Sequence, residues 1–528
     1  MATKLDQGIF SSLVQLTQMY TRPARRPWAS PSECCERLKR LCYKSIPMAP
    51  LSWLLSRGLA WPGYLLVFAY LMICASYGGA DGAAVVCPDT SAYEWPASHL
   101  SPLSVDFHTA CRPFTTLWLF WLVRRCHGLV VVSQIVIAAC GWLSLAIAMQ
   151  RLFHRRWVMF VAMLLTLLSS LAWPIQAWNY LLLSESLCFS LLPAVIALSM
   201  LVFHPGRSSV LQSSHPSAHQ LARPRASWAT VLVWGFLFLL WGGTRDTVMY
   251  SMAVVALGLL CRGLWLLRRT RRPHGLATPG PGPTFLVVSG LFLLCLSFGL
   301  NELTEKSGRW KATVLNSIQL RILPNRVARD EWVRELGMPD SPRLREFTGN
   351  YYWDHVGNAP EKIEDIVILS PEVFGGGLNG FPTWLSRHGL QAMRSYLLRH
   401  PWSTITSAVV AYARLPPYRS DGYLNSVQRP AVSRISAWLF FPVLGWEWRL
   451  FALTFLALVA GCCAERKWAP LAWSLVLLVN AFVQIETGYH GDAHAVDRHT
   501  LLAGILLRLS LIILFCGAID RRPDPYSA

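Results

Sequence analysis

Long apolar runs separated by short polar turns are the main pattern of this chain. The first run begins at Leu59, and the others follow to within a few residues of the C-terminus. A helix of about 20 apolar residues can cross a bilayer. The pattern therefore predicts an all-α polytopic membrane protein with about ten transmembrane helices. The expected spans are 59–77, 128–149, 157–174, 180–203, 227–243, 247–267, 284–300, 446–463, 469–486 and 501–517.

Basic residues in the polar segments predict the orientation of the spans. Cytoplasmic segments of membrane proteins are enriched in Lys and Arg, and the N-terminal tail, 1–58, is strongly basic. Three later turns on the same side are also basic, so we expect a multi-pass cell-membrane protein with both termini in the cytoplasm. The basic residues of those turns are Arg151, Arg155 and Arg156; Arg207, Arg223 and Arg225; and Arg268, Arg269, Arg271 and Arg272.

The apolar run 114–123 is too short to cross a bilayer. We expect it to form a helix at the outer membrane surface. Arg124 and Arg125 follow it and fall outside, against the rule for basic residues. If the run did cross, every later loop would change sides, and the sequence leaves this alternative open.

Four regions follow from the order of spans and polar segments. The basic tail, 1–58, precedes seven spans in 59–300, which include an external loop at 78–113. Residues 301–430 form a long polar section between spans seven and eight, predicted to be external. Within it, the stretch from Trp384 to Leu415 has the apolar periodicity and flanking Trp and Arg typical of interfacial helices. The last three spans and a short cytoplasmic tail occupy 431–528.

Composition changes this picture little. Only 15% of the residues are charged, against about a quarter in soluble domains. The net charge of +19 would also suit a nucleic-acid-binding protein, but the basic residues lie in turns beside apolar runs, so no nucleic-acid partner is expected. The 14 cysteines have no metal-binding spacing, and only Cys87 and Cys111 flank the first external loop, where a disulfide is an open question.

Ionisable residues collect at the predicted outer ends of the spans. Such groups near a bilayer are candidates for function because their burial in lipid is costly. A transporter should carry them nearer the midplane, so their position favours a polar chamber on one side of the membrane. The candidates are Asp89 and Glu94 in the first loop; Glu185 in its span; Arg245 and Asp246 at an outer turn; and Glu486 with HGDAHAVDRH, residues 490–499.

Several short motifs in a fixed order resemble the GT-C class of membrane glycosyltransferases. They are PDTSAY at 88–93, CRPF at 111–114, SES at 184–186, TRDT at 244–247 and HGDA…RH at 490–499, with NRV…GMP at 325–339 and RHPW at 399–402. The similarity covers most of 59–517. The first loop departs from the class pattern, because Asp89 is accompanied by Glu94 rather than by a second adjacent acid.

The resemblance implies transfer of a hexose or pentose from a polyprenyl-phosphate donor to an extracytoplasmic glycan, glycolipid or protein. Membrane lipid would surround an active site on the extracytoplasmic face. Asp89 is implied as the base that takes the acceptor proton, with Glu185 as a second catalytic candidate. Arg245 and Arg498 are suited to the donor phosphate. The remaining substrate-binding candidates are Tyr93, Glu94, Arg112, Asp246, His490, Asp492 and His499.

Each assignment has an alternative. Asp89 after Pro88 could simply open a turn, Glu185 could be a structural hydrogen-bonding group, and Arg245 could extend to lipid headgroups. No cofactor is indicated with certainty, although the alternation of His490, Asp492 and His494 allows a divalent metal. A transporter or flippase of a lipid-linked glycan would use the same chamber without chemistry.

The topology can be tested by labelling single cysteines introduced into the polar segments of intact cells. Because of the basic clusters, labels at 78–113 and 301–430 should react without permeabilisation, and labels at 1–58 and 521–528 should not. Reaction of 301–430 only after permeabilisation would contradict the orientation.

Overall fold

A computed structural model describes ten segments of the chain. They belong to one compact unit that begins at Ala60. Their β structure is limited to an isolated bridge between Val85 and Leu181, so the all-α prediction is confirmed for this part of the chain. The segments are 61–79, 84–110, 112–123, 126–203, 228–270, 282–349, 378–414, 447–465, 467–491 and 496–520.

Six described helices are long and apolar enough to cross a membrane, which supports a multi-pass membrane protein. They are α8 (His127–Met149), α11 (Ser184–Phe203), α13 (Val248–Thr270), α14 (Pro283–Ser307), α25 (Trp468–Gly491) and α26 (Val496–Ile519). A seventh candidate is α9 (Arg156–Ser170) with the short turns α10 (Trp173–Gln176) and η3 (Ala177–Tyr180), bent by 57°.

Three further predicted spans also form helices. These are α4 (Trp61–Gly79), α12 (Trp228–Gly242) and α24 (Glu447–Ala464), whose apolar stretches are shorter than those of the six long helices. A helix thus occupies each predicted span, while a total of ten crossings stays a prediction.

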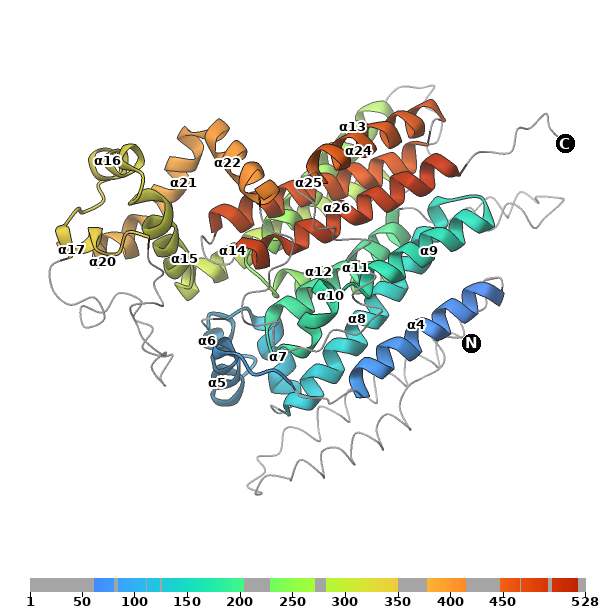
Figure 1. Cartoon of the computed structure of the whole chain (residues 1–528), viewed down its shortest axis with the longest axis horizontal. Coiled ribbons are helices and arrows are strands. Elements are labelled where there is room, and N and C mark those ends of the chain that lie inside the picture. The colour runs from blue at the N-terminus through green and yellow to red at the C-terminus, as the bar shows by residue number, and fades with distance from the viewer. Residues whose placement is uncertain are drawn as a thin grey trace, which may run out of the picture. The chain divides into compact units, whose positions relative to one another are not determined.

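Close helix pairs build the apolar core. The helices α8 and α11, α13 and α14, and α25 and α26 each pack side by side (Figure 1). Gly141 of α8 lies against the backbone of α11, where a Cβ would stand 2.3 Å from the carbonyl oxygen of Ser190. The missing side chain therefore lets these two helices approach closely.

The end of α26 is tied to two other helices. The carboxylate of Asp520 accepts hydrogen bonds from the backbone N–H groups of His154, at 2.9 Å, and Arg155, at 3.0 Å, just before α9. Lys467, before α25, donates to the backbone carbonyl of Asp520. These contacts fix the C-terminal end of α26 relative to α9 and α25.

The run 114–123 forms α7 (Phe114–Leu122), a helix of nine residues. At about 1.5 Å per residue it is far too short to cross a bilayer, as the sequence indicated. Most of its side chains are buried in the protein, including Leu117 and Phe120, and it packs against α5 (Ser91–His99). Arg124 and Arg125 lie outside the described residues.

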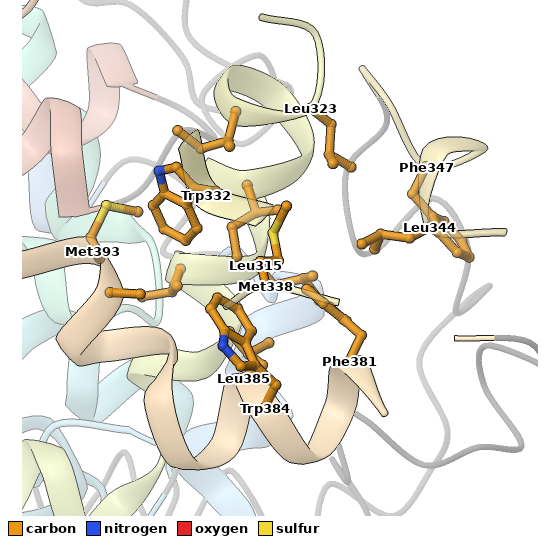
Figure 2. Close-up of a cluster of buried hydrophobic side chains, with 14 of the residues drawn as sticks. Leu315, Leu323, Trp332, Met338, Leu344, Phe347, Phe381, Trp384, Leu385 and Met393 are labelled. Carbon is orange, nitrogen blue, oxygen red and sulfur yellow. The ribbon is translucent and has the colours of Figure 1, made fainter. Parts of the chain in front are cut away.

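The described part of 301–430 has a hydrophobic core of its own (Figure 2). Trp332, Phe381, Trp384 and Leu385 are all buried in it. Part of the stretch predicted to be interfacial therefore lies inside the protein, whereas Trp402 is 77% exposed. The helices are α15 (Trp310–Ser317), the π-helix η5 (Ile318–Ile322), α16 (Arg326–Arg334), α17 (Pro342–Arg345), α20 (Phe381–Trp384), the π-helix η7 (Leu385–Gly389), α21 (Leu390–Arg399) and α22 (Pro401–Arg414).

Polar residues mark where helices of this section begin. The Asn325 side chain accepts hydrogen bonds from the N–H groups of Val327 and Ala328 at the start of α16. Ser341 accepts from the N–H of Leu344 at the start of α17. Side-chain acceptors of this kind satisfy N–H groups that have no partner within the helix.

Gly141→Ala should destabilise the protein, because the added methyl group must displace the backbone of α11. Overpacking of this kind typically costs about 1–3 kcal/mol, so thermal unfolding of the purified protein in detergent should occur at a lower temperature. Gly128→Ala, near the start of the same helix, is the control because a Cβ there meets nothing within 4 Å. Equal unfolding temperatures for both variants would contradict the close approach.

Candidate functional site

The candidate site lies at the end of the bundle where α11, α13 and α26 begin. Asp89 belongs to a single 3-10 turn, η1 (Pro88–Thr90). The N–H of Val85 donates to the carbonyl of Tyr180 at 2.9 Å, which ties this loop to the segment before α11. The backbone bridge thereby brings Asp89 close to Glu185 in the first turn of α11.

Arg498, in the first turn of α26, bridges these two carboxylates. Its Nε and Nη2 atoms each lie 2.6 Å from Oε1 of Glu185. Its Nη2 also lies 3.7 Å from Oδ2 of Asp89. One guanidinium group thus joins two acids that are far apart in the sequence.

Two more arginines complete the cluster. Arg112 places Nη2 2.6 Å from Oδ1 of Asp89. Arg245, in the turn between α12 and α13, has Nη2 3.8 Å from Oε1 of Glu185 and donates to Nδ1 of His499. The predicted candidates from four separate stretches of sequence therefore meet at one place.

The two carboxylates differ in their access to solvent. The side chain of Asp89 is 22% exposed, whereas that of Glu185 is 1% exposed. Burial raises the pKa of Asp89, but the charges of Arg112 and Arg498 outweigh this effect and lower it below its ordinary value. Asp89 is therefore ionised at neutral pH and keeps partial contact with solvent, whereas Glu185 has almost none.

Aromatic rings support the arginines. The Cζ atom of Arg498 lies 5.7 Å from the centre of the Trp178 ring. The Cζ atom of Arg112 lies 5.4 Å from the centre of the Tyr93 ring. Tyr93 is buried and donates to the Ser184 hydroxyl at 3.0 Å. Tyr93 thus packs against Arg112 from within the protein and is not exposed to solvent.

A buried polar network holds the bent connection between α9 and α11. The Gln176 amide donates to the carbonyl of Ser170 at 2.6 Å, and Asn179 donates to the Gln176 side chain at 3.3 Å. The Ser186 hydroxyl donates to the Asn179 side chain at 2.9 Å. Backbone and side-chain polar groups in apolar surroundings need such partners. The network fixes Trp178 and the start of α11.

Three predicted residues that the structure describes contact partners outside the cluster. Glu94 contacts His127 at the start of α8, and Asp246 pairs with Arg309 at 2.6 Å. The imidazole of His490 lies 3.1 Å from the carbonyl oxygen of Thr404. Asp492 lies outside the described residues.

Sequence reasoning missed Trp178, Arg309 and His127. Trp178 had one available signal, since it lies within the aromatic stretch WPIQAWNY, which ends shortly before the SES motif. Arg309 and His127 lie among other basic residues at the ends of long apolar runs, where position alone does not predict a partner.

The described residues contain no group of three or more His, Cys, Asp and Glu side chains placed to hold a metal ion. Asp492 and His494 of the metal alternative are outside the described segments. Cys87 is a buried free thiol, and Cys111, its predicted neighbour across the loop, is also outside them.

Comparison of the chain with family models, with curated proteins and with solved structures found no match.

Proposed function

We propose that this protein is a membrane glycosyltransferase of GT-C type. It transfers a sugar from a polyprenyl-phosphate donor to an extracytoplasmic glycan, glycolipid or protein. The observation that carries the proposal is the position of Arg498 between a buried carboxylate, Glu185, and a partly exposed one, Asp89. This arrangement supports assigning phosphate binding to Arg498 and the role of base to the partly exposed Asp89.

The charge of the cluster suits a phosphate. Ion pairs join three guanidinium groups, those of Arg112, Arg245 and Arg498, to the carboxylates of Asp89 and Glu185. Positive charge is therefore in excess within this set of described groups. Guanidinium groups bind phosphate oxygens in pairs of hydrogen bonds, and a partly buried position strengthens them.

The geometry also supports a role for donor binding in activating the base. Arg498 lies 3.7 Å from Asp89, further than its 2.6 Å contact with Glu185. A donor phosphate bound to Nη2 of Arg498 offsets the charge of one of the two arginines that lower the pKa of Asp89. The carboxylate then becomes a stronger base when the acceptor arrives.

The proposed reaction is a single displacement in which Asp89 is the catalytic base. The acceptor hydroxyl oxygen forms a bond to the anomeric carbon, and its proton passes to Asp89. The bond between that carbon and the phosphate oxygen breaks, and the electron pair leaves with polyprenyl phosphate. Arg498 and Arg245 stabilise the negative charge that develops on the leaving group.

In this mechanism Glu185 does not touch the reacting atoms. Its side chain is almost fully buried, and Arg498 and Arg245 lie between it and other groups of the site. We assign it to holding the two arginines. A flippase of a lipid-linked glycan remains the alternative, and it requires binding without an indispensable base.

Asp89→Asn should abolish sugar transfer while donor binding persists or becomes slightly tighter, since the change removes the base and frees the arginines for phosphate. Transfer is measured with a panel of radiolabelled polyprenyl-phosphate hexoses and pentoses in membranes. Glu94→Gln, in the same loop but paired with His127, should keep its activity. Substantial transfer by Asp89→Asn would exclude this base.

Arg498→Ala should weaken binding of the polyprenyl-phosphate donor at least tenfold, because hydrogen bonds to charged groups are typically worth about 1.5–3 kcal/mol. Arg498→Lys restores the charge but not the planar pair of donors, so it should recover only part of the affinity. Binding is measured by titration in nanodiscs after correct insertion has been checked. If Lys serves as well as Arg, Arg498 acts only as a membrane anchor.

A further inference from the structure

Arg309, directly after α14, joins three segments at the candidate site. Its Nε lies 2.7 Å from Oδ2 of Asp246 and its Nη2 lies 2.6 Å from Oδ1. Its Nη1 donates to the carbonyl of Ala110 in the first loop at 3.3 Å. The hydroxyl of Thr304 donates to the same carboxylate at 2.9 Å. These bonds hold Asp246, which follows Arg245 in the turn between α12 and α13.

A glycine turns the chain so that Arg309 can make these contacts. Gly308 ends α14 with a φ of +69°, in the left-handed region that residues with a Cβ rarely adopt. The chain then enters α15 without a loop. Arg309 is therefore anchored by backbone geometry as well as by its ion pair, and its side chain is only 14% exposed.

At the other end of the same segment, Arg321 and Ser317 bind the last turn of α25. Arg321 donates to the carbonyl of Tyr489, and its Cζ lies 3.6 Å from the centre of the Tyr489 ring. Ser317 donates to the carbonyl of His490 at 3.4 Å. Carbonyl groups at a helix C-terminus have no partner within the helix, and a cation there is favourable.

The end of α25 is in turn packed on the start of α26. A Cβ at Gly488 would stand 3.2 Å from backbone atoms of His499 and 3.0 Å from the Thr500 side chain. Any movement of this end of α25 must therefore move the residues beside Arg498.

We propose that residues 309–321 form a bracket that holds the two halves of the cationic site in register. One half is the turn that carries Arg245, and the other is the start of α26 with Arg498 and His499. Arg309 and Arg321 are positioning residues that act through Asp246 and through the end of α25. The effect on donor binding rests on the proposed function, whereas the mechanical coupling does not.

The first test measures binding of a polyprenyl monophosphate in nanodiscs. Arg309→Ala and Arg321→Ala should each bind it about tenfold more weakly, equivalent to about 1.4 kcal/mol. The control variants are Arg345→Ala and Arg399→Ala, which lose exposed ion pairs to Asp340 and Glu335 in the same section, and they should bind as the wild type does. Equal weakening in the controls would overturn the proposal.

A double variant separates positioning from direct contact with the ligand. If Arg309 acts through Asp246, the variant carrying both Arg309→Ala and Asp246→Asn should bind no more weakly than Arg309→Ala alone. A further loss in the double variant would mean that the two residues act separately, and the bracket would be wrong. Arg309→Lys should recover part of the affinity, because it keeps the charge but not the paired hydrogen bonds.

The second test needs no ligand. Amide hydrogen exchange is followed at 244–250 and at 486–491 in each variant. If the bracket couples the two halves, each substitution should affect the far half, meaning the one that the substituted residue does not contact. Arg309→Ala should therefore speed exchange at 486–491 about threefold, and Arg321→Ala should speed exchange at 244–250 by the same factor. Changes confined to the near half, or none, would overturn the bracket. If the wild type does not bind the phosphate but the far-half effects occur, the bracket stands and the proposed function fails.

Discussion

The burial of Glu185 is the constraint on which the rest of the site depends. A carboxylate with a side-chain exposure of 1% has lost nearly all its contact with water, and in apolar surroundings this costs several kcal/mol unless cations compensate. Arg498 and Arg245 provide that compensation from the first turn of α26 and from the turn before α13. Three helices must therefore begin at the same level, because an ion pair is effective only at short distance.

The surrounding structure satisfies this requirement in several ways. The hydrogen bonds among Ser170, Gln176, Asn179 and Ser186 hold the bent connection that leads into α11. At its far end α26 is tied to α9 and to the start of α25 through Asp520. The helix that carries Arg498 is thus held at both ends, which keeps the Arg498 side chain in one place.

The packing of the helices gives different environments to charged residues that look alike in the sequence. Glu185 and Asp89 are both acids beside arginines, yet only Asp89 retains exposure to solvent, so only it can meet a second molecule. Arg245 lies in the turn TRDT and contacts Glu185 of α11, whereas Arg309, which follows the helix pair α13 and α14, pairs with Asp246 of the same turn. In the proposed mechanism the exposed acid reacts and the buried one holds the cations.

The sequence by itself determined the helical character, the positions of the apolar helices and most members of the cationic cluster. Helix periodicity and the cost of ionisable groups in lipid act locally, so Asp89, Glu185, Arg245 and Arg498 could be selected from their positions along the chain. Only the tertiary structure decided which partners they have. Glu94 pairs with His127, and Asp246 pairs with Arg309. A side chain's partner depends on the packing of helices far apart in the sequence, and local pattern carries no information about that packing.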